Sequence, residues 1–442
     1  MLDQTFDKIS RIRNLSEFRL PMLFFGLAVW VITPIIGNIP ILLSIQLDLL
    51  RTKPTRPKLL SLNNLLLLLV VLGVAVYVSA FDIFADTRVY LDVYNTFDTE
   101  NPFDNQFVRD RYEFVLFALL YAIHWLTNGS EYLCLFIFAL LSASLVSFYI
   151  SKKLAPKYYP TLLIIIFSTF YYYSQIFYMR QFLSILLVIM AIAALESSWL
   201  MFAVWSSLAI FSHLSSAMYI AVGLFSRIGF SLIKNIKLKL EKTDKVMLYV
   251  FLGFVLALLI YIAWQIYNNP QEIYRYINDI LDLLPQKQLS SSLQDRVTNY
   301  DGRDTDTFAF DIYRIIATAA LGIIIITKGF RQLTPKVLSL DIIYVISILQ
   351  IAFIMVTGFN QRIAYLFMTF YGCFFCIGLD ERAKIKTIAP ISLLTMLVAA
   401  GNTYNFLRIQ AFMIDNDGWS FFDGQPLAMS LYDYIVYFFQ HC

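Results

Sequence analysis

The sequence predicts an all-α polytopic membrane protein. Of its 442 residues, 59% are hydrophobic and only 15% are charged, whereas about a quarter of the residues in a typical soluble domain are charged. The apolar residues also occur in runs of about 20, the length that an α-helix needs to cross a bilayer. These observations predict a single integral membrane domain over residues 1–442, and the polar start of the chain predicts no cleavable signal peptide.

Most of the apolar runs are expected to be transmembrane spans. Residues 20–46 would form the first span, although prolines interrupt it, and residues 60–80 the second. The further expected spans cover residues 131–150, 159–177, 180–196, 246–266, 310–328, 337–357, 362–379 and 388–406. Because cytoplasmic loops are rich in Lys and Arg, the basic loops are placed inside. These loops are residues 51–58, 152–157, 227–245, 328–336 and 380–386.

One apolar run is not expected to cross the membrane. The polar and acidic segment 81–111 is placed outside and the basic loop 152–157 inside, yet two apolar runs separate them. Since two crossings would return the chain to the same side, one run stays on the outer face. The shorter run, Glu113–Leu126, is therefore predicted to lie along that face as a juxtamembrane helix. Residues 81–130 then form an external loop that contains this helix.

The apolar stretch 199–226 is expected to break in its middle. The loop near Glu196 and the basic segment after the stretch are both placed inside, so the stretch cannot be a single span. The polar cluster Ser212–Ser216 is the natural break between two short helices. This break places His213 near the outer face, close in depth to Arg180.

Counted in this way, the chain has about 12 spans with both termini outside. Residues 267–309 are then a second external loop, and residues 407–442 are an external, polar C-terminal tail. The basic residues before the first span favour another arrangement. If residues 20–46 form a re-entrant hairpin around Pro34–Pro40, the N-terminus lies inside.

Arginine and lysine are distributed unequally between the two faces. The inside loops contain mostly lysine, whereas the segments placed outside contain almost only arginine. The planar guanidinium of arginine binds phosphate and carboxylate groups through two parallel hydrogen bonds, so the pattern indicates an anion-binding surface on the outer face. The alternative is that each loop arginine pairs with a nearby acid, as Arg296 could with Asp295.

Arg180 and Arg362 are the strongest candidates for this surface. Each begins an apolar helix at its outer end, where the helix dipole favours anions. A charged side chain at that depth is costly without a partner.

His213 is the candidate general base, because its charge can change near neutral pH. The alternative is a histidine satisfied by a backbone carbonyl. Asp86 and Glu113 compete for the role of base. The sequence shows no nucleotide-binding glycine loop and no metal-ligand spacing, so no cofactor, metal or nucleic acid is expected.

Five short motifs follow one another along the chain. They are Asp86-Thr87-Arg88-Val89-Tyr90, Arg111-Tyr112-Glu113, Arg180-Gln181, His213-Leu214-Ser215-Ser216 and Asn360-Gln361-Arg362. Their order and spacing over roughly residues 80–380 resemble the EpsG-like branch of the Wzy-type polysaccharide polymerases. The chain departs from that pattern in its longer N-terminal segment and in the residues that follow Glu113.

The resemblance implies a GT-C-like fold and a metal-independent glycosyltransferase in the bacterial inner membrane, with its active site facing the periplasm or exterior. The growing glycan on undecaprenyl diphosphate would be the donor, and an undecaprenyl-diphosphate-linked repeat unit the acceptor. The product would be O-antigen, capsule or exopolysaccharide. The lipid bilayer and a chain-length regulator protein would be partners. His213, Asp86 and Glu113 are the candidate bases. The expected diphosphate- and glycan-binding residues are Arg180, Gln181, Arg362, Arg88, Arg111, Tyr90 and Tyr178.

Three other functions fit much of the same evidence. One is a glycan ligase, and another is a GT-C transferase that uses a polyprenyl-phosphate sugar. The third is a flippase or exporter of lipid-linked oligosaccharides, which would need cationic groups throughout the depth of its spans. The arginines here are expected at one face, which favours an enzyme.

Overall fold

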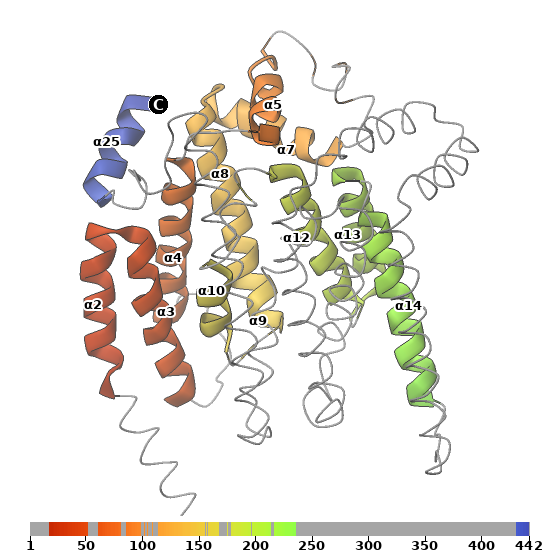
Figure 1. Ribbon diagram of the computed structural model, residues 1–442, viewed down its shortest axis with the longest axis horizontal. Helices are drawn as coiled ribbons and strands as arrows, with labels where there is room; N and C mark the ends of the chain where they lie inside the picture. Colours follow the sequence, from red (N-terminus) through yellow and green to blue (C-terminus); the bar gives the residue numbers. More distant parts are fainter. Residues whose placement is uncertain are drawn as a thin grey trace, which may run out of the picture.

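The computed structural model is helical throughout its described residues (Figure 1). These residues are 17–51, 61–80, 85–98, 114–154, 158–167, 178–195, 197–213, 216–235 and 430–441, with 101, 104, 108, 156 and 175 singly. Two helices in this part of the chain are long and apolar enough to cross a membrane, Leu62–Ser79 and Glu131–Lys153. The prediction of a helical membrane protein is confirmed at this level. The spans expected beyond residue 235 and the loop 267–309 lie outside the described residues.

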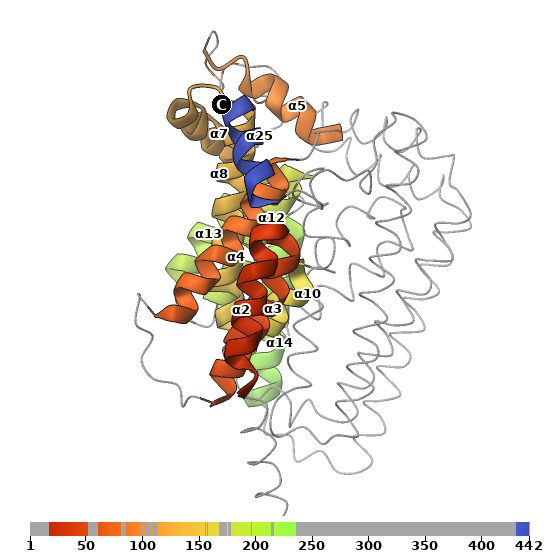
Figure 2. The same ribbon diagram turned by 90° about the vertical axis from the view of Figure 1, so that its left-hand side faces the viewer.

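Most of the helices run side by side along one direction (Figures 1 and 2). The elements are α2 (Arg19–Ile32), α3 (Pro34–Arg51), α4 (Leu62–Ser79), α5 (Ala85–Tyr94), α7 (Phe114–Thr127), α8 (Glu131–Ser144), η1 (Leu145–Ile150), α9 (Ser151–Leu154), α10 (Tyr159–Phe167), α12 (Met179–Ala194), α13 (Trp199–Ser212), α14 (Ser216–Asn235) and α25 (Leu431–His441). A π-helical segment, η1, continues α8 into α9.

Residues 20–46 do not form one span, so that expectation is wrong. The chain forms a hairpin instead, which turns at Thr33 rather than around Pro34–Pro40, and its re-entry from the inner side stays a prediction. The chain is extended at Thr33, with φ −147° and ψ 93°, and turns back between α2 and α3. Pro34 then begins α3, a position where the missing N–H of proline costs nothing. At the open end of the hairpin, Arg19 and Asp48 form an ion pair of 2.7 Å. The N-terminal end of α2 and the C-terminal end of α3 therefore lie on the same side.

Small residues and a buried amide hold this hairpin together. A Cβ on Gly37 would approach the Cα of Trp30 to 2.4 Å, so only glycine permits this contact. The indole Nε1 of Trp30 donates a hydrogen bond to Asn38 Oδ1 at 3.1 Å. Asn38 in turn donates from Nδ2 to the backbone oxygen of Val70 in α4 at 3.2 Å. Buried polar groups are stable only when they are paired, so these bonds fix the hairpin against α4.

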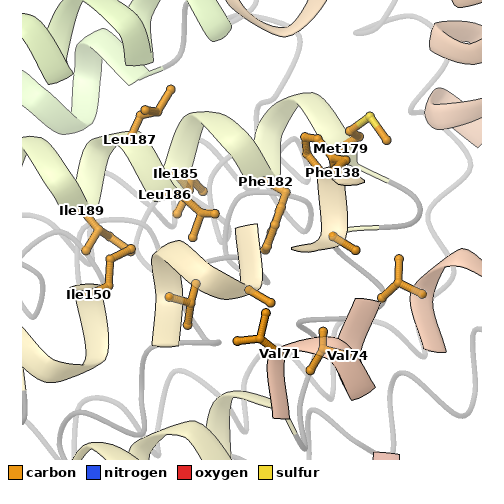
Figure 3. Close-up of a cluster of buried hydrophobic side chains, with 14 of the residues drawn as sticks. Val71, Val74, Phe138, Ile150, Met179, Phe182, Ile185, Leu186, Leu187 and Ile189 are labelled. Atoms are coloured by element: carbon orange, nitrogen blue, oxygen red, sulfur yellow. The ribbon is translucent and has the colours of Figure 1, made fainter. Parts of the chain in front are cut away.

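The central helix of the bundle is α12. Apart from Gln181 and Leu183, every residue from Met179 to Ala194 is buried. A helix that is apolar around its whole circumference is expected to be surrounded by others. Figure 3 shows its side chains facing those of α8, η1 and α4, with Phe182 on the side of Val71. The first turn of α12 is therefore held in place by the whole bundle.

The helix α7 lies across one end of the bundle. Figure 2 shows it nearly end-on, while α2, α3 and α4 run up the page. With 14 residues its length is about 21 Å, less than the roughly 30 Å of a bilayer core. Phe117 and Leu120 are buried, whereas Trp125 is 81% exposed. This is the orientation expected for Glu113–Leu126, and its position at an outer membrane face stays a prediction.

The stretch 199–226 breaks where the charge pattern predicted. The helix α13 ends at Ser212, and α14 begins at Ser216. Between them His213 has an extended backbone, with φ −157° and ψ 121°. The predicted break is confirmed, and it lies at the same end of the bundle as α7 (Figure 1).

The tail 407–442 was expected to be polar, but its last part forms the helix α25. One face of α25 packs on the bundle, where the rings of Tyr437 and Phe438 lie 5.5 and 5.7 Å from that of Tyr132. The other face exposes Tyr432 and Phe439. The description of the tail as polar is therefore wrong for residues 431–441.

Candidate functional site

The start of α12 and the break between α13 and α14 meet in space. The Oγ of Ser212 donates to the backbone oxygen of Arg180 at 3.5 Å. One turn further along α12, the hydroxyls of Ser184 and Ser216 are hydrogen-bonded to each other. These contacts hold the chain on both sides of His213 against the first turns of α12.

Gln181 and His213 are in direct contact. The Nε2 atom of Gln181 lies 3.2 Å from Nε2 of His213, at hydrogen-bond distance. Gln181 follows Arg180 directly, so three of the residues expected in the site come together at one end of the bundle. The histidine belongs to a break between helices, where its ring is partly exposed.

Arg180 is buried beneath α5. Its side chain is only 5% exposed, and its Cζ atom lies 5.6 Å from the centre of the Tyr90 ring, within the range of a cation–π interaction. Tyr90 packs edge-on against Phe117 of α7, with 6.0 Å between the ring centres. Four elements, α5, α7, α12 and α13, thus surround Arg180 and His213. Helix N-termini also attract anions. The start of α12 therefore offers two groups that can bind an anion, the guanidinium of Arg180 and the N–H groups of the helix N-terminus.

Tyr178 lies at the edge of this site. It precedes α12 as its N-cap residue, and its backbone oxygen accepts a hydrogen bond from Phe182 N at 2.8 Å. Its side chain is partly exposed. The structure therefore places Tyr178 next to Arg180 in the first turn, while its role in binding stays a prediction.

Arg88 is paired with acidic side chains, the arrangement considered as the alternative for the loop arginines. Its Nε lies 3.0 Å from Asp92 Oδ1, and its Nη1 lies 3.1 Å from Glu131 Oε2. Arg88 and Tyr90 are two positions apart and so lie on different sides of α5. The ion pairs are exposed and contribute little energy, but they tie α5 to the start of α8.

Four predicted site residues remain, and they are Asp86, Arg111, Glu113 and Arg362. Asp86 lies in the first turn of α5, one helical turn before Tyr90. Arg111, Glu113 and Arg362 lie outside the described residues. Within the part of the chain that is described, no three His, Cys, Asp or Glu side chains come together as a metal ion would require.

A second histidine is part of a buried cluster that the sequence analysis did not identify. The residues are Tyr94 at the end of α5, Phe97 just after it, and His124 in α7. The His124 ring lies 4.8 Å from the Tyr94 ring and 5.6 Å from the Phe97 ring. The hydroxyl of Tyr94 bonds that of Thr127 at 2.7 Å, and burial raises the pKa of Tyr94 to about 12. His124 is only 6% exposed, whereas the neighbouring Trp125 is 81% exposed. His124 lies four residues after Leu120, on the buried face of α7, and this spacing could have predicted its burial.

These features define a class: a helical membrane protein whose buried arginine and partly exposed histidine lie together at one end of the bundle. The model of the EpsG family matches residues 64–413 of the chain. The chain therefore belongs to the EpsG family, a family of Wzy-like polysaccharide polymerase-type proteins. The matched region begins within α4 and ends before α25, so the N-terminal hairpin and the C-terminal helix lie outside it. No curated protein and no solved structure matches the chain.

Proposed function

We propose that this polymerase-like membrane protein transfers a growing glycan from undecaprenyl diphosphate onto an undecaprenyl-diphosphate-linked repeat unit, at the outer face of the bacterial inner membrane. One observation carries the proposal: Arg180, Gln181 and His213 meet at the end of the bundle where α5 and α7 also lie. A cation and a base in one place are what a glycosyl transfer from a diphosphate needs.

The leaving diphosphate is the group that the arginines would stabilise. Negative charge develops on it as the bond to the anomeric carbon breaks. A guanidinium and the N-terminal N–H groups of α12 are fixed before the reaction begins, so they stabilise this charge without rearranging. Arg362, Arg111 and Arg88 are further candidates, with Arg180 as the central one. Without a metal, such cations supply the charge stabilisation that a bound divalent ion would otherwise provide.

His213 is the proposed base. A hydroxyl oxygen of the acceptor sugar attacks the anomeric carbon of the donor, and the bond from that carbon to the diphosphate oxygen breaks. The hydroxyl proton passes to a ring nitrogen of His213, and undecaprenyl diphosphate departs as the anion. Asp86 and Glu113 remain the competing candidates for this step.

The membrane arrangement follows from the same counting of charges. With the N-terminal hairpin in place of a first span, about 11 crossings remain. The N-terminus is then inside, while residues 81–130, 267–309 and 407–442 are outside. The juxtamembrane α7 and the site beside it agree with a GT-C-like arrangement, in which the reaction takes place at the outer face.

The test is polymerisation by the purified protein. The protein is placed in liposomes with the lipid-linked repeat unit, a metal chelator and no nucleotide. The expected product is a ladder of lipid-linked chains that differ by one repeat unit. Transfer of the glycan only to another lipid or to protein would identify a ligase instead. Movement of the lipid-linked unit across the bilayer without extension would identify a flippase.

A further inference from the structure

Gln181 occupies one ring nitrogen of the candidate base. Its side-chain Nε2 lies 3.2 Å from His213 Nε2, so this nitrogen is engaged within the protein. The contact joins two rigid parts of the fold. Gln181 belongs to the first turn of the buried helix α12, and the hydroxyl pair Ser184–Ser216 holds the start of α14 one turn below.

The orientation of the Gln181 amide decides where His213 carries its proton. If the amide nitrogen faces the ring, it donates to Nε2, and the ring proton must then be on Nδ1. In that orientation Gln181 Oε1 is buried and has no hydrogen-bond partner among the described residues. If the amide is rotated by 180°, its oxygen accepts from Nε2–H, and the lone pair is on Nδ1. Only the second arrangement leaves the neutral ring able to accept a proton while the contact with Gln181 is kept.

We propose that Gln181 is the positioning residue of His213: its side-chain oxygen accepts a hydrogen bond from Nε2–H and keeps the lone pair on Nδ1, the nitrogen that takes the proton of the acceptor hydroxyl. The inference rests on the proposed function, because it assigns Gln181 a role in the same transfer. It differs from the role first expected for Gln181, which was direct binding of the diphosphate or glycan.

The ionisable side chains around this pair belong to α5, α7, α12 and α14 in the described part of the chain. They are Arg88, Tyr90, Asp92 and Tyr94 of α5, Tyr121 and His124 of α7, Arg180 of α12, and Tyr219 and Arg227 of α14. Arg88 is paired with Asp92 and Glu131. Arg227 lies over the ring of Trp199, at the opposite end of α13.

The first test reads the proton position directly. The chain has three histidines, so ¹⁵N-histidine NMR of the full-length protein in nanodiscs gives few signals, and a His213→Gln variant identifies those of His213. The expected wild-type spectrum shows neutral His213 with its proton on Nε2. In Gln181→Met, the proton is expected to be shared between the two nitrogens. Gln175→Met is the matched control, because Gln175 is also buried but donates to Ser142 Oγ at 2.7 Å. This control should leave the His213 signals unchanged.

The second test uses the reaction. Gln181→Met should lower kcat about tenfold, the effect of losing one hydrogen bond that matters in the transition state, with KM for the lipid-linked donor nearly unchanged. Gln181→Glu keeps an acceptor oxygen and adds a charge that favours the imidazolium. It should retain most of the activity at high pH and move the acidic limb of the pH–rate profile upward by about one to three units.

Three results would overturn the assignment. The first is a wild-type His213 with its proton on Nδ1, and the second is a proton position that Gln181→Met does not change. The third is a rise in KM with an unshifted pH profile, which would mean that Gln181 binds substrate. The NMR reading does not need polymerisation, so a failed polymerase assay would refute the proposed function while leaving the Gln181–His213 pairing to be judged separately.

Discussion

Replacement of Arg180 is the most direct perturbation of the proposed site. The side chain is 5% exposed and stacks on Tyr90. Hydrogen bonds to charged groups contribute about 1.5–3 kcal/mol. Loss of such bonds from the transition state corresponds to about 10- to 150-fold in rate. Arg180→Met keeps much of the apolar stem and removes only the guanidinium, so it is preferable to Arg180→Ala.

The assay is a time course of extension of a lipid-linked repeat unit over many turnovers, with chain length read on gels. Arg180→Met should abolish long chains, whereas Arg180→Lys should retain part of the rate, because lysine keeps the charge but not the planar fork. The cation–π contact contributes about 0.5–2 kcal/mol, so a thermal unfolding curve in detergent must accompany each variant.

The matched control is Arg227→Met. Arg227 also stacks on an aromatic ring, with its Cζ 4.4 Å from the centre of the Trp199 ring. It lies at the opposite end of α13 from His213, so its loss tests a similar contact far from the site. The control should polymerise normally. Wild-type ladders from a well-folded Arg180→Met protein would refute the assignment of Arg180 to the diphosphate.

Three further outcomes are expected. His213→Ala should lower kcat by about 10²- to 10⁴-fold, the contribution of a general base, while binding of the lipid diphosphate is nearly unchanged; an equal loss of binding would indicate a structural histidine. In a cysteine-free background, Asn128→Cys should be labelled from outside the cell and Lys153→Cys should not, and protection at position 128 would contradict an external α7. Asn38→Leu leaves the indole N–H of Trp30 without its acceptor and should lower the free energy of unfolding by about 1–3 kcal/mol; unchanged thermal stability would show that this network does not hold the hairpin.

The distribution of charged residues among the loops predicted two features of the fold, a helix break and an apolar helix that does not cross the membrane. The break at Ser212–Ser216 was predicted because the loop near Glu196 and the basic segment after the stretch 199–226 were both placed inside, and the helices α13 and α14 end and begin at this break. The same rule predicted that the apolar run after Glu113 would not cross. Neither prediction needed any knowledge of side-chain contacts.

Features that depend on packing were not predicted. The hairpin of α2 and α3 needs a close helix contact at Gly37 and a hydrogen bond from Trp30 to Asn38, and a hydropathy pattern contains neither. For α25, the sequence did contain a signal, because Ser430 and Asp433 cap one another at its start and aromatic residues follow. Hydropathy averaged over a long tail hides a helix of this length.

The contact between Gln181 and His213 was also beyond sequence reasoning. Parity placed His213 and Arg180 at one depth, but residues at one depth can lie on distant helices. The hydrogen bonds of Ser212 to the Arg180 backbone and of Ser184 to Ser216 determine that they are neighbours. Ser212 and Ser216 belong to the polar cluster that the sequence analysis used to place the helix break, whereas Ser184 was not singled out there.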